Sequence, residues 1–192
     1  MRFYEYDTLL GRITIAENAG RIVRISPAFD AARLQGERSE TALIREAFRQ
    51  LDDYFDGKLF EFSLPLAPQG TDFMQSVWRA LREIPYGQTV SYKDIAVKIG
   101  NPKAVRAVGM ANHRNPIAIV IPCHRVIGSG GIRVKAPGNT DGIQIKAPGY
   151  TDSQLVGYRS GLENKRKLLE LEARNVLCSP EVPERENPSG TG

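Results

Sequence analysis

Cysteine and histidine are scarce in this sequence of 192 residues, which holds two of each. Cys123 and Cys178 are too few for a disulfide framework, and no C-x-x-C pair offers a zinc site. We therefore expect a reduced compartment, no bound metal and no disulfide.

Long hydrophobic runs are also missing. No apolar stretch approaches the length that spans a bilayer, and the first residues, MRFYEYDTLLGR, lack the apolar segment of a signal peptide. These absences predict an intracellular, cytoplasmic protein with no membrane partner. The net charge of +4 and the pI near 9.1 fit a phosphate-binding surface, but many proteins with no polyanionic partner are equally basic.

The first third of the chain predicts a small unit of strands and one helix. Residues 11–17 and 20–26 alternate around ENAG, a pattern typical of a hairpin with a glycine turn. Alternation at residues 59–66 predicts a further strand, and APQG at 67–70 is a natural boundary. Between them, apolar residues at helical spacing predict a helix that Gly57 ends: Ile44, Ala47, Phe48, Leu51, Tyr54 and Phe55.

From residue 71 the pattern becomes helical. Asp72 is the expected cap of one helix, with Gln75 at its third position. Ser91 and Asp94 form the expected capping box of the next helix, which Gly100 ends.

A further helix is expected over NPKAVRAVGMANH, residues 101–113, with Asn101 as its cap and Pro102 at its first position. Two short helices joined by a tight turn predict a helix-turn-helix, and an αα-hairpin packed in a core is the alternative. Lys103 and Arg106 stand among small residues, as a surface that presses closely on a groove requires.

The last part of the chain contains a direct repeat. IRVKAPGNTDG (132–142) and IQIKAPGYTDS (143–153) each pair an alternating stretch with a Pro-Gly turn, which predicts a β-ribbon extension. ENKRKLLELEARN (163–175) predicts a final helix. The polar, proline-rich tail, residues 176–192, is expected to be disordered.

Cys123 stands in IPCHRVIG and has three interpretations: a nucleophile, a metal ligand or a small core residue. Buried, inert cysteines are common. Here Pro122 and His124 flank it at the end of an apolar run, and the charge of Arg125 would favour the thiolate. Metal ligation is the weakest interpretation because no second cysteine lies nearby.

IPCHRVIG resembles the active-site signature of the O6-alkylguanine-DNA alkyltransferases, the methylated-DNA–protein-cysteine methyltransferases. FMQSVWRALREIPYGQTVSYKDIA, NPKAVRAVG, NPIAIVIPCHRVI and GYRSGLENKRKLLELE match the family in order and spacing. The resemblance implies an α+β fold in two domains. A small N-terminal α/β, ribonuclease-H-like domain would cover residues 1–68. A mainly helical catalytic and DNA-binding domain, with a helix-turn-helix and a short strand carrying PCHR, would cover 69–175.

The resemblance also implies a function and a site. Such a protein flips O6-alkylguanine out of double-stranded DNA and transfers the alkyl group irreversibly to Cys123, once per chain, as a monomer without a cofactor. O4-alkylthymine is a second candidate substrate. Only the register of the last helix selects Glu172 over Glu170. The implied catalytic residues are Cys123, His124, Glu172 and Asn115, and the implied DNA- and substrate-binding residues are Tyr92, Arg106, Tyr158, Arg159 and Ser160.

The sequence departs from the family between PCHRV and GY. Removing residues 132–153 restores the family spacing. Two hypotheses for this insert remain open. It forms a ribbon beside the pocket in which Arg133, Lys135 and Lys146 contact DNA phosphate, or it is a tolerated surface extension, since long loop insertions cost little stability.

Three other classes of protein fit less well. A relative that binds alkylated bases without repairing them would lack Cys123. A helix-turn-helix transcription factor would not need PCHR. A cysteine hydrolase would need an oxyanion hole that nothing in the sequence indicates.

Overall fold

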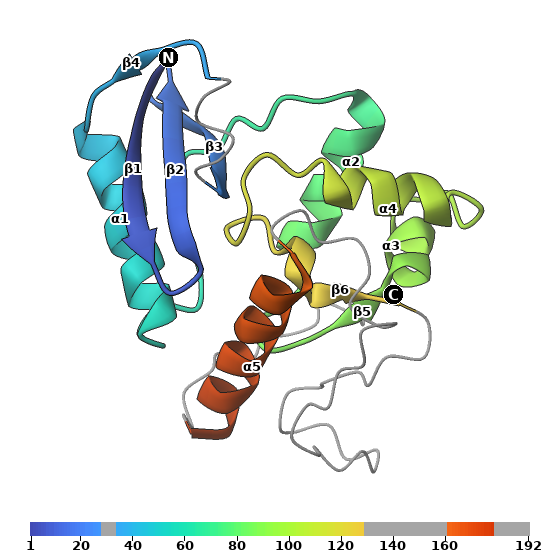
Figure 1. The fold of residues 1–192 in the computed structure, drawn as a ribbon. Coiled ribbons are helices and arrows are strands. Elements are labelled where there is room, and N and C mark those ends of the chain that lie inside the picture. Colours follow the sequence, from blue (N-terminus) through green and yellow to red (C-terminus); the bar gives the residue numbers. More distant parts are fainter. Residues whose placement is uncertain (28–33, 129–160, 179–192) are drawn as a thin grey trace, which may run out of the picture.

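The N-terminal part of the chain is a four-stranded sheet covered on one face by a helix (Figure 1). The computed structural model describes residues 1–27, 34–128 and 161–178. The strand order is β3-β2-β1-β4, and β4 runs parallel to β1. The elements of this part are β1 (Arg2–Thr8), β2 (Gly11–Asn18), β3 (Arg21–Pro27), β4 (Glu37–Arg38) and α1 (Ala42–Phe55).

The predicted hairpin is confirmed as β2 and β3, which pair antiparallel. Its turn places Ala19 and Gly20 at φ values of 49° and 71°. Two successive left-handed residues are what a type I′ hairpin turn requires, and the twist of this turn matches that of the strands. The sequence reading missed β1, which pairs with the other side of β2 along its whole length.

The outer edge of β3 is hydrogen-bonded to later segments of the chain. The Ile22 amide donates to the Pro65 carbonyl at 2.8 Å, and the Ile25 amide donates to the Pro116 carbonyl at 2.9 Å. The Ala118 amide returns a bond to the Ile25 carbonyl at 2.9 Å. Two later segments of the chain therefore cover this edge, and the second of them leads directly into the PCHR motif.

The prediction of a strand at residues 59–66 is wrong. Only Leu66 forms a bridge, to Ile22, and the rest of this stretch has no ladder partner among the described residues. Pro65 lacks the N–H that a ladder needs. The alternating phenylalanines of this stretch instead pack against aromatic side chains. The ring centroid of Phe62, for example, lies 5.4 Å from that of Tyr54 on α1.

The C-terminal part consists of helices and one small parallel pair of strands (Figure 1). Helices α3 and α4 pack together across a tight turn, as the predicted helix-turn-helix requires. The elements are α2 (Asp72–Arg82), β5 (Val90–Ser91), α3 (Tyr92–Lys98), α4 (Val105–His113), the 3₁₀ turn η2 (Cys123–Arg125), β6 (Val126–Ile127) and α5 (Leu162–Cys178).

The helix caps partly follow the prediction. The capping box of Ser91 and Asp94 at the start of α3 is confirmed. For α2, the cap is Thr71, whose hydroxyl accepts from the Met74 amide, and Asp72 is the first helical residue. Threonine and aspartate are both good caps, and the prediction was wrong by one position.

The predicted start of α4 is wrong by three residues, since the cap position is Ala104 instead of Asn101. Asn101 does not cap this helix, because the Ala104 amide donates to the Asn101 carbonyl at 3.0 Å and closes a turn. Pro102 occupies the second position of that turn, where its fixed φ is favourable. The helix begins only at Val105, with no side-chain cap at Ala104.

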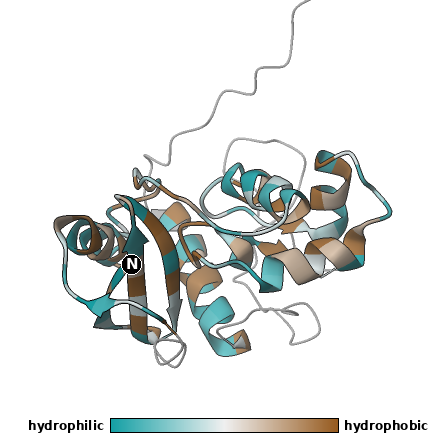
Figure 2. Ribbon diagram, turned by 90° about the horizontal axis from the view of Figure 1, so that it is seen from above, coloured by the Kyte–Doolittle hydropathy of each residue, from teal (hydrophilic) through white to brown (hydrophobic). Residues whose placement is uncertain are grey.

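One hydrophobic core runs through both parts of the chain. The Trp78 indole N–H donates to the Ala111 carbonyl at 2.9 Å and fixes α2 to α4. Figure 2 shows strands and helices banded into hydrophobic and hydrophilic residues, as amphipathic elements around a shared core are. Within the described residues, no helix is long and apolar enough to cross a membrane.

The end of the chain differs from expectation in one respect. Helix α5 continues to Cys178, so residues 176–178, expected in the disordered tail, are helical. The insert at 132–153, the segment Tyr158–Ser160 and residues 179–192 lie outside the described residues. The division into domains at residue 68 stays a prediction.

Candidate active site

Cys123 lies on a 3₁₀ turn and not on the short strand that was predicted. The apolar run before it is broken by two three-residue turns. The Val120 amide donates to the Ala118 carbonyl at 2.9 Å, and the Cys123 amide donates to the Ile121 carbonyl at 2.8 Å. The first turn holds Ile119 at a φ of 73°, a costly conformation for a β-branched residue. This strained segment delivers the cysteine to a fixed point.

The side chain of Asn115 ties this segment to the sulfur. Its Nδ2 donates to the Ile121 carbonyl at 2.8 Å and to Cys123 Sγ at 3.1 Å, and its Oδ1 accepts from the Ile117 amide at 3.0 Å. An N–H directed at sulfur favours the charged form of the thiol. Asn112, which the sequence reading did not single out, donates from Nδ2 to the Cys123 carbonyl at 3.2 Å.

Burial and charge act on the Cys123 thiol in opposite directions. The residue is 4% exposed, and burial raises its pKa because a thiolate loses hydration. The Asn115 hydrogen bond and the charge of Lys165 lower the pKa but do not fully offset burial. The nucleophile is therefore hidden and needs a base to become reactive.

Lys165 is a site residue that the sequence reading missed. Its side chain is fully buried in α5, and Nζ donates to the Val126 carbonyl at 2.7 Å. Burial lowers the pKa of Lys165 to about 8, although the negative charge that Cys123 can carry favours the ammonium. The sequence did contain a signal for the burial of Lys165. Residues 165, 168, 169 and 172 fall on one face of the helix, and the other three are two leucines and the expected catalytic glutamate.

Glu172 is a buried carboxylate surrounded by donors. Its Oε1 accepts from His124 Nε2 at 2.8 Å, from Tyr54 Oη at 2.7 Å and from Arg125 Nη2 at 2.8 Å. Its Oε2 accepts from the Gly87 amide at 2.9 Å. Burial alone would raise the pKa of the Glu172 carboxyl, but the charges and hydrogen bonds of Arg125 and His124 hold it well below its usual range.

Gly87 supplies its bond to Glu172 from a backbone conformation that favours glycine. Its φ is 72°, and a Cβ at this position would collide with the Val176 side chain. The close approach of the 85–88 turn to α5 therefore depends on the absence of a side chain. A larger residue would push α5, and Glu172 with it, away from the turn.

The partners of His124 assign its tautomer. Glu172 is ionised and can only accept, so Nε2 carries the proton. Burial lowers the pKa of His124, and the nearby carboxylate only partly opposes this. The ring is therefore neutral, and Nδ1 has a free lone pair. Within the described part of the chain Nδ1 has no hydrogen-bond partner, which leaves it as the atom that can accept a proton.

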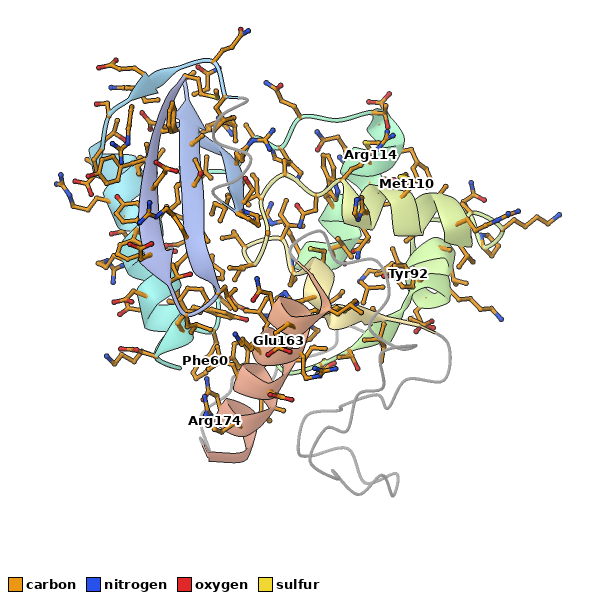
Figure 3. All side chains as sticks on the ribbon, in the orientation of Figure 1. Phe60, Tyr92, Met110, Arg114, Glu163 and Arg174 are labelled. Atoms are coloured by element: carbon orange, nitrogen blue, oxygen red, sulfur yellow. The ribbon has the colours of Figure 1, made fainter. Side chains whose placement is uncertain are left out.

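Tyr92 and α4 form the outer side of the site. Figure 3 places Tyr92 at the start of α3, below Met110 on α4 and below Arg114, the residue that follows α4. Burial, and the charge that Cys123 can carry, raise the pKa of Tyr92 to about 12, so its hydroxyl stays protonated. Met110 is 52% exposed, and Arg106 lies one turn before it on the same exposed face of α4.

The basic residues on and next to α4 differ from those of α1 in their ion pairing. On α1, Arg45 and Arg49 pair with carboxylates at 2.8 Å or less. Within the ranges that the structure describes, Lys103, Arg106 and Arg114 form no ion pair. Exposed cations without carboxylate partners next to small residues are typical of a surface that binds phosphate.

Tyr158, Arg159 and Ser160 fall outside the described residues, so their place relative to Cys123 stays a prediction. The structure brings together Cys123, His124, Asn115, Glu172 and Tyr92. Among the described residues, no group of three or more His, Cys, Asp or Glu side chains is arranged to hold a metal ion.

Comparison with known proteins gives a family for this fold and site. Residues 1–68 match the ribonuclease-like domain, and residues 72–147 the DNA-binding domain, of 6-O-methylguanine DNA methyltransferase. A methylated-DNA–protein-cysteine methyltransferase of Mycobacterium leprae is 42% identical over 90% of this chain and 93% of its own. One from Methanosarcina barkeri is 56% identical over 69% of this chain and 70% of its own.

A solved structure agrees with these relatives. The crystal structure of Mycobacterium tuberculosis OGT in complex with DNA has a TM-score of 0.75 and 38% identity, covering 91% of this chain and 94% of that one. The site and the fold thus define a DNA-repair methyltransferase that uses a cysteine as acceptor. The chain belongs to the 6-O-methylguanine DNA methyltransferase family.

The lowered pKa of His124 predicts a loss of stability in mild acid. Below the unfolded pKa of 6.5, the unfolded histidine binds a proton that the folded one does not. The free energy of unfolding should therefore fall as the pH drops from about 6.5 to 5, by up to about 1.4 kcal/mol per pH unit from this group. Denaturant unfolding at several pH values measures this slope.

His124→Gln should lose this part of the slope, whereas His113→Gln, which changes an exposed histidine, should keep it. Equal slopes in the two variants would contradict the assignment of a neutral, buried His124.

Replacing Lys165 should make the thiol harder to ionise. Lys165→Met removes the buried cation near Cys123 while keeping most of the side-chain volume. The pKa of Cys123 should rise by about one unit, and its thiolate fraction at a given pH should fall about tenfold. Ultraviolet absorbance of the thiolate, taken as a difference from Cys123→Ala, measures this titration. Lys167→Met, an exposed lysine of the same helix, is the control and should leave it unchanged.

Proposed function

We propose that this chain repairs double-stranded DNA containing O6-alkylguanine by transferring the alkyl group to Cys123, once per molecule. The observation that carries this proposal is the His124–Glu172 pair at 2.8 Å, adjacent in the chain to a buried thiol whose sulfur accepts from Asn115. A thiol in this setting has a base to ionise it and a donor to hold the resulting charge.

The first step is removal of the thiol proton. His124 accepts it at Nδ1, through a relaying water, while Nε2–H stays bonded to Glu172. The imidazolium that forms is stabilised by the carboxylate, and Lys165 and Asn115 stabilise the thiolate. The resting thiol is thus largely protonated and becomes a nucleophile only when the proton can move.

The second step is displacement at carbon. The Cys123 sulfur forms a bond to the alkyl carbon as the bond from that carbon to guanine O6 breaks, and the guanine takes the electron pair. Tyr92, protonated because its pKa is about 12, donates a hydrogen bond to the departing guanine. The departing guanine anion takes up one proton, which balances the proton that the thiol lost to His124. Neutral, repaired guanine and S-alkylcysteine are the products.

A thioether is stable, and no group in the proposed mechanism hydrolyses it. The protein is therefore consumed, one chain for each lesion, and the reaction needs no cofactor. O4-alkylthymine, which carries the alkyl group in a comparable position, is a second substrate in this proposal. The monomeric state and the cytoplasmic location remain predictions from the sequence.

DNA binding is assigned to α3 and α4. The small residues of α4 allow close approach to the minor groove, and Arg106 enters the stack in place of the flipped nucleotide. Met110, on the same exposed face, is the apolar side chain placed to contact the opened base step.

Mass spectrometry of the intact protein tests the reaction. After mixing with a duplex that carries one O6-methylguanine, the chain should gain one methyl group at one-to-one stoichiometry, located on Cys123. Cys123→Ala should bind the duplex and gain no mass. Tight binding without any mass gain by the unsubstituted chain would refute alkyl transfer and leave a protein that only recognises damage.

The Arg106→Ala variant should distinguish a role of Arg106 in base flipping from a role in the alkyl-transfer step. We expect methyl transfer from the duplex to slow by at least about tenfold, because base flipping loses the side chain that occupies the vacated position. Transfer from the free O6-methylguanine nucleobase should not change. Arg49→Ala removes an arginine from α1 and should affect neither rate, so single-turnover rates of the two variants on both substrates decide the role of Arg106.

A further inference from the structure

Tyr54 joins the catalytic pair from the N-terminal part of the chain. It lies in α1, is fully buried, and is 118 residues away from Glu172 in the sequence. Its hydroxyl donates to Glu172 Oε1 at 2.7 Å, and the same hydroxyl oxygen lies 3.5 Å from His124 Nε2. The sequence reading took Tyr54 only as part of an apolar helix face.

The direction of this hydrogen bond is unambiguous. Burial, together with the negative charge of Glu172, raises the pKa of Tyr54 well above its ordinary value, so the hydroxyl keeps its proton. The ionised carboxylate can only accept. Tyr54 therefore donates to the same oxygen that accepts from His124 and Arg125. Three residues donate to one oxygen, and each reduces the negative charge available to the others.

The ring of Tyr54 is held by packing. Its centroid lies 5.4 Å from that of Phe62 and 5.7 Å from those of Phe55 and Tyr86, in tilted or edge-to-face contacts. Phe60 also belongs to this aromatic group, with its ring centroid 4.9 Å from that of Tyr86, and Figure 3 places it between α1 and α5. The hydroxyl is thus delivered to one position and cannot follow Glu172 if the carboxylate moves.

We propose that Tyr54 is a positioning residue for alkyl transfer: its hydroxyl fixes the Glu172 carboxylate and moderates the pull of that carboxylate on His124. This proposal rests on the function proposed above and extends it to the N-terminal part of the chain. Residues 1–68 then complete the catalytic hydrogen-bond network and are more than a scaffold beside it.

The pH dependence of the reaction reports this role. Among the described residues, the titratable groups that face His124 are Glu172 and Lys165 on α5, Arg125 on η2 and Tyr54 on α1. Without the Tyr54 hydroxyl, Oε1 presents more negative charge to the imidazole, which favours its protonated form and raises the pKa of His124. Because only neutral His124 can accept the thiol proton, the acid limb of the rate profile should move to higher pH.

The experiment compares two variants that each lose one hydroxyl from the same aromatic group. Tyr54→Phe removes the bond to Glu172. Tyr86→Phe is the matched control, because the Tyr86 hydroxyl accepts from Asn175 Nδ2 at 2.9 Å, whereas the Tyr54 hydroxyl donates to Glu172. Single-turnover methyl transfer from free O6-methylguanine is measured from about pH 5 to 9, so that DNA binding does not enter the rate.

For Tyr54→Phe we expect the acid limb to move up by about one pH unit, which lowers the rate below that limb about tenfold. Tyr86→Phe should keep the profile of the unsubstituted chain. Site-specific replacement of Tyr54 by 3-fluorotyrosine keeps the size and the hydroxyl but makes it a stronger donor, and should move the limb to lower pH. This replacement also serves if Tyr54→Phe does not fold.

An unchanged acid limb in Tyr54→Phe, whether the rate is normal or uniformly reduced, would overturn the proposal and leave Tyr54 a purely structural residue. So would an upward shift with fluorotyrosine. If the unsubstituted chain transfers no methyl group, the proposed function itself fails. In that case nitrogen NMR of the His124 ring, titrated with and without the Tyr54 hydroxyl, still tests the effect on the histidine.

Discussion

The site depends on one buried carboxylate. Glu172 accepts hydrogen bonds from the turn before β5, from the PCHR turn and from α1, so that three segments distant in the sequence meet at two oxygens. Such a charge is tolerable in the core only because every neighbour is a donor. Removing Glu172 would leave the guanidinium of Arg125 buried without its counterion, and His124 without the partner that sets its tautomer. Folding and chemistry therefore share the same interaction.

The surroundings of the Cys123 thiol bury it and also contain groups that favour its ionisation. Burial protects the Cys123 thiol from solvent and disfavours its ionisation. Asn115 and Lys165 oppose that effect without cancelling it, and His124 is neutral and oriented to take the proton. A thiol of this kind stays mostly protonated until a substrate excludes water and aligns the alkyl carbon. This suits a protein that can react only once, since an exposed thiolate would be used up by other electrophiles.

Much of this arrangement could be predicted from local sequence, and the rest could not. The hairpin and the capping box at Ser91 follow from short-range patterns. The strand at 59–66 was wrong because alternation reports which side chains face inward, and not whether a backbone partner exists. Asn101 was misassigned because a good helix cap is also a good turn former. The helix-face spacing could have marked Lys165 as buried, but its role, like that of Tyr54, comes from contacts between distant segments, which no local pattern reveals.

The covered edge of β3 has a consequence for the independence of the two parts of the chain. Ile25 shares backbone hydrogen bonds with the segment that leads to Cys123, so the sheet is completed by the part of the protein that carries the nucleophile. A fragment made of residues 1–68 alone would expose that stretch of edge, which offers unpaired amide and carbonyl groups to other copies and promotes self-association. The N-terminal sheet can therefore stand apart from the rest of the chain only if something else pairs with or covers this stretch of edge.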